Sequence, residues 1–159
     1  MPRSRRSLSR PGSRRSGSDR TRYSSGTPWE PKVGYSRAVR VGRQVFVSGT
    51  TATQPDGSIA SPGDAYLQTV RTLENIETAL EALGSRRGSI VRLRIFVTDM
   101  ADFEGVARAL GERFRPIRPA CTLVEIGRLV DPAMRVEIEA DAIDPVDRPS
   151  GKGRRSPAR

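Results

Sequence analysis

The stretch "SIVRLRIFVTD", residues 89–99, alternates apolar and polar side chains along most of its length. A period of two residues is typical of a β-strand that buries one of its faces. One face of this predicted strand carries the aliphatic residues Val91, Leu93, Ile95 and Val97. The other face carries Arg92, Arg94, Phe96 and Thr98. The strand therefore needs an apolar layer on one side only.

The segment before this strand predicts a helix that supplies such a layer. Its apolar residues recur at spacings of three and four, and Gly84 follows the last of them, as is common after a helix. The stripe consists of Tyr66, Val70, Leu73, Ile76, Leu80 and Leu83. The preceding "SPGD" predicts the start of the helix, with Ser61 as the cap, Pro62 at the first helical position and Asp64 as the capping-box acid.

The remaining segments complete one domain. Residues 101–114 predict a second helix, and residues 120–129 and 134–143 predict two more strands. Residues 35–50 contain two short apolar runs around Gly42-Arg43, which favours a tight hairpin. The predicted order is β-β-α-β-α-β-β, an α+β fold with one mixed sheet and two helices on a single face.

The sheet face opposite the helices has an unusual composition. We assign Thr122, Val124 and Ile126 to the helix side, together with the aliphatic residues of the other strands. The outer face then combines apolar residues with charged ones, namely Phe96, Cys121, Leu123, Arg92, Arg94, Glu125, Glu137 and Glu139. A solvated sheet face is the simple alternative, but this mixture favours a subunit interface with polar pockets.

The net charge of +10 is concentrated at the two ends of the chain. Residues 1–29 hold eight arginines and one acid, and residues 148–159 hold five basic residues and no acid. Residues 30–147 hold 15 basic and 17 acidic residues, a net charge of −2. We therefore expect a globular domain at 30–147 between two disordered basic tails. Such tails are either simply solvated or bind nucleic acid non-specifically.

The sequence also argues against several classes of protein. No apolar run is long enough to span a membrane, and the basic start lacks the apolar core of a signal peptide. The chain has one cysteine and no histidine, so an internal disulfide and a Cys–His catalytic pair are both excluded. The carboxylates lack metal-ligand spacing, so no metal site is predicted. We expect a cytoplasmic protein, with an organelle transit peptide as the alternative reading of the Arg/Ser-rich start.

Four segments resemble the Rid family, the reactive intermediate deaminases, also called the YjgF-like or endoribonuclease L-PSP family. They are "GYSRAVRVGRQVFVSGT" (34–50), "QTVRTLENIETALEALG" (68–84), "RLRIFVTDMADFEGV" (92–106) and "RPACTLVEIGRLVDPAMRVEIEADA" (118–142). The resemblance implies a chorismate-mutase-like fold. It also implies a homotrimer whose sheets form a central barrel, with small-molecule sites in the clefts between subunits. It implies no metal and no cofactor.

The resemblance also implies a set of site residues. Deaminating members hydrolyse enamine and imine acids to keto acids and ammonia. Glu137 of "VEIEA" falls where the family positions the attacking water, and Tyr35 and Ser48 fall where residues line the pocket. The family's carboxylate-binding arginine falls on Cys121, and Thr50 replaces a glutamine.

Cys121 makes the usual deamination of 2-imino acids doubtful. A thiol carries no charge, and losing a hydrogen bond to a charged group costs about 1.5–3 kcal/mol. Arg118 and Arg94 are candidate substitutes. We expect Cys121 to line a pocket rather than to act as a nucleophile, because the chain offers no histidine to activate it.

Three functions remain open. The first is hydrolysis of reactive imine or enamine intermediates other than the usual 2-imino acids. The second is a non-catalytic trimer that binds metabolites or regulates a partner. The third is RNA binding or cleavage, which the family's older name suggests but the acidic central domain disfavours.

Overall fold

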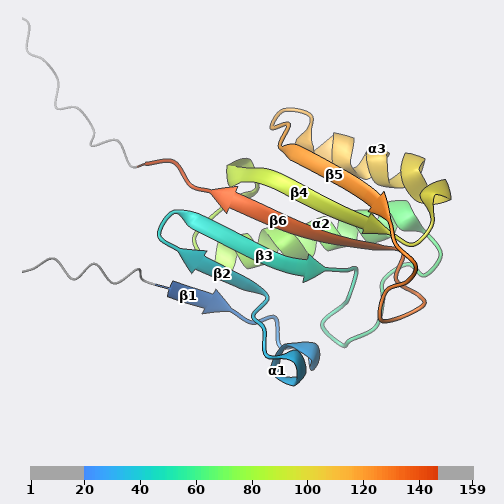
Figure 1. The fold of residues 1–159 in the computed structure, drawn as a ribbon, viewed down its shortest axis with the longest axis horizontal. Coiled ribbons are helices and arrows are strands. Elements are labelled where there is room, and N and C mark those ends of the chain that lie inside the picture. Colours follow the sequence, from blue (N-terminus) through green and yellow to red (C-terminus); the bar gives the residue numbers. More distant parts are fainter. Residues whose placement is uncertain (1–19, 147–159) are drawn as a thin grey trace, which may run out of the picture.

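The computed structural model describes residues 20–146. Its strands are β1 (Arg20–Tyr23), β2 (Ala38–Val41), β3 (Gln44–Thr50), β4 (Ile90–Val97), β5 (Ala120–Glu125) and β6 (Val136–Ile143). Its α-helices are α1 (Trp29–Val33), α2 (Ala65–Ala82) and α3 (Phe103–Phe114), and the short 3₁₀ helices η1 (Arg87–Ser89) and η2 (Met100–Asp102) flank β4. Figure 1 shows these elements in one layered unit.

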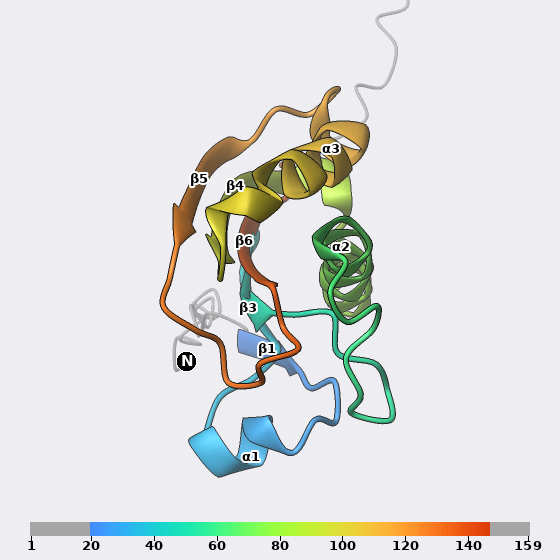
Figure 2. The same ribbon diagram turned by 90° about the vertical axis from the view of Figure 1, so that its right-hand side faces the viewer.

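The six strands form one sheet in the order β1-β2-β3-β6-β4-β5. Strand β5 runs parallel to β4, and the other neighbouring pairs are antiparallel. Figure 2 shows α2 and α3 together on one side of this sheet. The prediction of an α+β fold, with one mixed sheet and two main helices on one face, is confirmed. The predicted hairpin around Gly42-Arg43 is also present, since Val41 pairs with Gln44.

The N-terminal boundary differs from the predicted one. The sequence places residues 20–29 in a disordered tail, but residues 20–23 form β1, which pairs with β2 at the edge of the sheet. Helix α1 begins at Trp29. The low apolar content of this segment hides its order, because β1 is held by backbone pairing with β2 and by a single side chain, Tyr23, that packs against the core. The rest of the two expected tails lies outside the described residues.

The buried face of α2 also differs from the predicted stripe. Tyr66 and Val70 are only half-buried, whereas Gln68, Thr69 and Thr72 are fully buried. Gln68 occupies a core position because its amide is satisfied: Nε2 donates to Ala133 O at 2.7 Å and Oε1 accepts from Arg135 N at 2.8 Å.

The start of α2 lies three residues later than predicted. The capping residue is Asp64, whose carboxylate accepts from the backbone N–H of Leu67 at 2.9 Å. Ser61 instead has a positive φ of 47°, so "SPGD" forms a turn before the helix.

The face of β5 is reversed relative to the prediction, and in β4 the prediction fails at Val91 alone, since Leu93, Ile95 and Val97 are buried. A register shift between Ile90 and Arg92 leaves Val91 exposed and puts Ile90 in the core. In β5, Leu123 pairs with Ile95 and packs against the core, while Val124 is exposed. Apolar residues occur at both parities of β5, so alternation alone could not settle its orientation.

Within residues 20–146, no helix combines the length and the apolar composition needed to cross a bilayer.

Candidate functional site

A cavity of about 640 Å³ lies at one end of the sheet. Its wall comes from the segment around β1 and α1, the end of β3, the following loop, the middle of α2, and β6. Figure 2 shows α1 and the connection from β3 to α2 at this end. Tyr35, Ser48 and Glu137, which the resemblance implies as site residues, all line the cavity.

Glu137 lies closely against the backbone of β3. It alternates with the buried Val136 and Ile138, so its side chain points away from the helix layer. At Gly49, a Cβ atom would lie 1.9 Å from Glu137 Oε1, so only glycine leaves room for the carboxylate. The pairing of β3 with β6 shifts between Val47 and Thr50, around this contact. Such irregularities commonly redirect side chains beside functional sites.

The Glu137 carboxylate has no hydrogen bond or salt bridge to any other described residue. Burial raises its pKa above the ordinary value. The positive charge of Arg37 opposes this shift, and the negative charge of Glu139 adds to it. The result is a carboxylate that can exchange a proton closer to neutral pH than an exposed glutamate can.

Arg37 is the main site residue that sequence reasoning missed. It is buried, and its Nη1 donates to Gly49 O and, at 3.0 Å, to Thr50 Oγ1. Its Nη2 donates to Tyr35 Oη at 2.7 Å. Arg37 therefore ties the ends of two strands together beside Glu137. Its position two residues after Tyr35, on the same side of the chain, was the only signal available in the sequence.

The hydroxyl groups of Tyr35 and Ser48 differ in the hydrogen bonds that they make within the protein. Tyr35 Oη accepts from Arg37, which leaves the proton of the tyrosine free for a ligand. Ser48 Oγ donates its proton to Ser36 O at 2.8 Å, so it can only accept from a ligand. Tyr35 is therefore the better hydrogen-bond donor to a molecule in the cavity.

Glu30 of α1 forms an ion pair with Arg37. Glu30 Oε1 lies 3.7 Å from Arg37 Nε. The same carboxylate accepts from the Ser24 hydroxyl, from Ser25 N at 3.1 Å and from Ser25 Oγ at 2.6 Å. Burial alone would raise the pKa of Glu30, but these hydrogen bonds and the charge of Arg37 outweigh it and lower the pKa. Glu30 is therefore an ionised structural residue.

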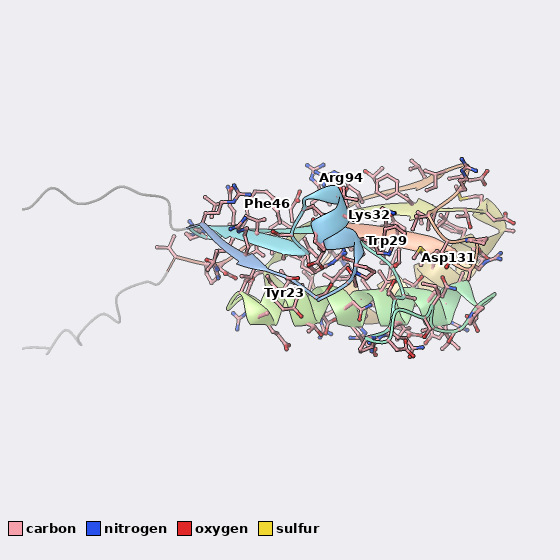
Figure 3. All side chains as sticks on the ribbon, turned by 90° about the horizontal axis from the view of Figure 1, so that it is seen from below. Tyr23, Trp29, Lys32, Phe46, Arg94 and Asp131 are labelled. Carbon is pink, nitrogen blue, oxygen red and sulfur yellow. The ribbon has the colours of Figure 1, made fainter. Side chains whose placement is uncertain are left out.

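The other three predicted site residues lie outside this cavity in the single chain. Arg94 projects from the outer face of β4, where Nη1 lies 3.1 Å from Glu139 Oε2 and Nη2 lies 3.2 Å from Asp141 Oδ2. Figure 3 shows Arg94 and Phe46 on the side of the sheet away from α2. Arg118 is exposed, has a φ of 51°, and donates from Nε to Arg115 O at 3.2 Å.

Cys121 lies at the edge strand β5, beyond β6 and β4 as seen from β3. It pairs with Leu93, so it shares the helix side of the sheet rather than the outer face predicted for it. Partial desolvation raises the pKa of its thiol. A raised pKa keeps the thiol protonated at neutral pH, which disfavours a role as nucleophile.

Within the described part of the chain, no group of three or more His, Cys, Asp and Glu residues is placed to hold a metal ion.

Comparisons with known proteins agree with the fold. A family model described as "Endoribonuclease L-PSP" matches residues 26–144. The uncharacterized protein SCO2049 of Streptomyces coelicolor is 35% identical over 121 residues, which is 76% of this chain and 90% of the relative.

Two solved structures extend the comparison. The crystal structure of Rv2704 from Mycobacterium tuberculosis, a member of the YjgF/YER057c/UK114 family, matches with 42% identity and a TM-score of 0.72 over 79% of this chain and 100% of that one. E. coli TdcF, solved with bound serine, matches with 30% identity and a TM-score of 0.64 over 70% of this chain and 88% of that one. The chain therefore belongs to the YjgF-like, or endoribonuclease L-PSP, family.

Proposed function

We propose that the protein hydrolyses small reactive imines, and enamines after they tautomerise to imines, at the C=N bond, with Glu137 as the residue that activates water. The observation that carries this proposal is the state of the Glu137 carboxylate. It lines a cavity, it lacks a partner among the described residues, and burial raises its pKa. A carboxylate in this state suits proton transfer better than it suits structural support.

The reaction needs only a base, a water molecule and a hydrogen-bond donor. Glu137 accepts a proton from water as the water oxygen forms a bond to the imine carbon, and the C=N electron pair moves to nitrogen. The proton then passes from Glu137 to that nitrogen. Glu137 then takes the hydroxyl proton of this carbinolamine and passes it to the nitrogen, the O–H electron pair forms the C=O bond, and the C–N bond breaks, which leaves a carbonyl compound and ammonia or an amine. The Tyr35 hydroxyl is placed to donate a hydrogen bond to the ligand during these steps.

A small substrate suits the cavity. A volume of about 640 Å³ falls within the usual size of small-molecule sites. The relative TdcF holds serine, an amino acid of a few heavy atoms. We propose a substrate of similar size, formed as an unstable intermediate by another enzyme.

The test is a coupled assay in which an amino-acid oxidase generates imines from a panel of amino acids. Wild type should accelerate imine hydrolysis, and Glu137→Gln should lower the rate about 100-fold or more, because loss of a positioned base commonly costs that much. Glu139→Gln is the matched control, since Glu139 lies two residues away on the same strand but pairs with Arg94. Equal loss in both variants, or an active Glu137→Gln, would refute the proposed role.

The pH dependence adds a second readout. Glu137 must be ionised to accept a proton, so the rate should rise with pH through the raised pKa of Glu137. The midpoint of this acidic limb should lie above 4.5, the ordinary pKa of a glutamate. A limb at or below that value would point to a different group.

A non-catalytic metabolite-binding or regulatory protein is the second candidate. It is favoured by one observation, the neutral thiol of Cys121 at the position where the resemblance places an arginine. Under this alternative, wild type shows no turnover with any imine, and Glu137→Gln still binds the same small molecules.

We also propose that the protein assembles as a homotrimer through the outer face of its sheet. The support is an exposed apolar surface beside charged residues: Phe46 is 44% exposed and Val124 is 41% exposed, next to the Arg94 ion pairs. Sedimentation equilibrium should give three times the chain mass of 17.4 kDa. A mass of one chain would contradict this assembly.

A further inference from the structure

The guanidinium of Arg37 is committed to contacts within the protein. Arg37 is buried, and three of its five N–H groups donate to protein atoms. Nη1 donates to Gly49 O and to Thr50 Oγ1, and Nη2 donates to Tyr35 Oη. Nε faces the carboxylate of Glu30, which supplies the counter-charge. This use of its donors and its charge suits Arg37 to organising the cavity wall rather than to binding a ligand.

The contact with Tyr35 fixes the direction of a proton. Arg37 Nη2 lies 2.7 Å from Tyr35 Oη, and the guanidinium carbon lies 5.3 Å from the centre of the tyrosine ring. A guanidinium can only donate, so the tyrosine oxygen turns a lone pair to Arg37 and its proton away from Arg37. Accepting a hydrogen bond from a cation also strengthens the hydrogen bond that the hydroxyl donates. Arg37 therefore holds Tyr35 as a donor toward the cavity that Tyr35 lines.

The contacts with Gly49 and Thr50 place the same guanidinium beside the Glu137 carboxylate. That carboxylate lies against Gly49, and Arg37 binds the carbonyl oxygen of this glycine where the pairing of β3 with β6 shifts. The Thr50 hydroxyl accepts from Arg37 at 3.0 Å and donates to Ser48 O at 2.8 Å. This short series of hydrogen bonds fixes the end of β3. The backbone against which Glu137 packs therefore depends on Arg37.

The charge of Arg37 also acts on the ionisation of Glu137. Burial raises the pKa of the Glu137 carboxyl, the positive charge of Arg37 lowers it, and the negative charge of Glu139 raises it. The other residues that face Glu137 across the cavity or from β3 and β4 are Arg71, Tyr35, Tyr23, Gly49 and Phe96. Removing the charge of Arg37 should therefore move the titration of Glu137 to higher pH.

We infer that Arg37 is the positioning residue of this site, because one buried guanidinium both directs the Tyr35 hydroxyl into the cavity and fixes the backbone against which the Glu137 carboxylate lies. The hydrogen-bond donor and the base are then aligned by a single group that does not itself touch the substrate. Glu30 holds that group in turn through its ion pair. The inference rests on the proposed function for the identity of the reaction.

The experiment separates the charge of Arg37 from its shape. Arg37→Lys keeps the charge but cannot bond to Tyr35, Gly49 and Thr50 together. It should lower kcat for imine hydrolysis about tenfold or more with little change in KM, because misaligned groups lose rate rather than binding. It should leave the pKa of Glu137, followed by carbon-13 NMR of the side-chain carboxyl, close to that of wild type. Arg37→Gln loses both properties, so it should also raise that pKa.

Two further variants complete the design. Arg40→Gln is the matched control, since Arg40 is a partly buried arginine that pairs with Asp144 outside the cavity. It should change neither kcat nor the pKa of Glu137. If Arg37→Gln does not fold, the double variant Glu30→Gln/Arg37→Gln removes both charges of the pair and tests the same shift.

The contact with Tyr35 is tested by a double-mutant cycle. In a Tyr35→Phe background, Arg37→Lys should cost less than it does in wild type, both in kcat and in the urea midpoint, because the hydroxyl that it directs is gone. Additive effects would overturn the inference. An increase in KM with unchanged kcat in Arg37→Lys would show that Arg37 binds the substrate and would also overturn it. An equal loss of kcat in Arg40→Gln would contradict it as well.

The NMR titration and the urea midpoints require no turnover. If wild type hydrolyses no imine, yet Arg37→Gln alone raises the pKa of Glu137 and the Tyr35 cycle shows coupling, the inference stands and the proposed function fails. If wild type hydrolyses imines and both Arg37 variants match it in kcat, the proposed function stands and the inference fails.

Discussion

Two glutamates near Arg37, the buried Glu30 and the half-buried Glu137, have opposite electrostatic states. Glu30 in α1 receives hydrogen bonds from Ser24 and Ser25 and an ion pair from Arg37, and its pKa is lowered. Burial raises the pKa of Glu137 in β6, the more distant charge of Arg37 opposes this shift, and the negative charge of Glu139 adds to it. Burial penalises both charges, so the difference comes from the hydrogen bonds to Glu30 and from the negative charge of Glu139 near Glu137. One carboxylate stabilises the wall of the cavity, and the other has no hydrogen bond or ion pair among the described residues.

The largest expected effect on stability comes from Glu30→Gln. The amide would direct its NH₂ group at hydroxyl donors and would leave Arg37 without its counter-charge. We expect the free energy of unfolding to fall by about 1.5–3 kcal/mol at neutral pH. Urea denaturation measures this loss. Glu112→Gln is the control, because Glu112 is exposed and should change stability by less than about 0.5 kcal/mol.

The pH dependence of that loss follows from the lowered pKa. The contribution of ionised Glu30 to the free energy of unfolding is fully present above about pH 4.5, the ordinary pKa of a glutamate. It disappears as the pH falls through the lowered pKa that Glu30 has in the folded protein. Wild type and Glu30→Gln should therefore converge in acid. If the two proteins still differ in free energy of unfolding well below the pKa of Glu30 in the folded protein, the shape of the side chain rather than its charge is responsible.

Glu137→Gln should change stability in the opposite direction. Because the pKa of Glu137 is raised in the folded state, its charge destabilises the fold as the pH rises from about 4.5 through the raised value. The variant should be more stable than wild type at neutral pH and equal to it in acid. Thermal unfolding across this range measures the difference. A variant that is less stable at neutral pH would show that Glu137 has a structural partner like that of Glu30.

Gly49→Ala tests the close packing of Glu137 against β3. The added methyl group would force the carboxylate to rotate away, and we expect a loss of about 1 kcal/mol, since the clash involves the end of a flexible side chain. Imine hydrolysis should fall much more than stability does. The double variant Gly49→Ala/Glu137→Ala should recover the stability. If it does not, the alanine strains the strand itself rather than the carboxylate.

The smallest expected effect is that of Cys121→Arg. The residue is exposed at the edge strand, so stability should change by less than about 0.5 kcal/mol in the monomeric fold. A large gain of hydrolysis in this variant would instead show that a second copy brings position 121 to the cavity.

Much of the fold followed from residue patterns, because helices α2 and α3 and strands β4 and β6 have strong amphipathic periods. Errors arose where periodicity carries little information. Val91 lies in a register shift, and β5 carries apolar residues at both parities. At the site, Tyr35, Ser48 and Glu137 came from the resemblance, and the structure places them in one cavity. Arg37 and Glu30 were missed because their importance depends on contacts between separate segments of the chain.

The Glu30–Arg37 contact has a practical consequence for anyone shortening this protein. Composition suggests cutting the chain just before residue 30, where the arginine-rich segment ends. Such a cut would keep Glu30 but remove Ser24 and Ser25, which hold its carboxylate, and strand β1 as well. The shortened protein would still contain most of the core, yet part of the cavity wall would be missing. A truncation that begins at or before Arg20 preserves every contact that positions Arg37.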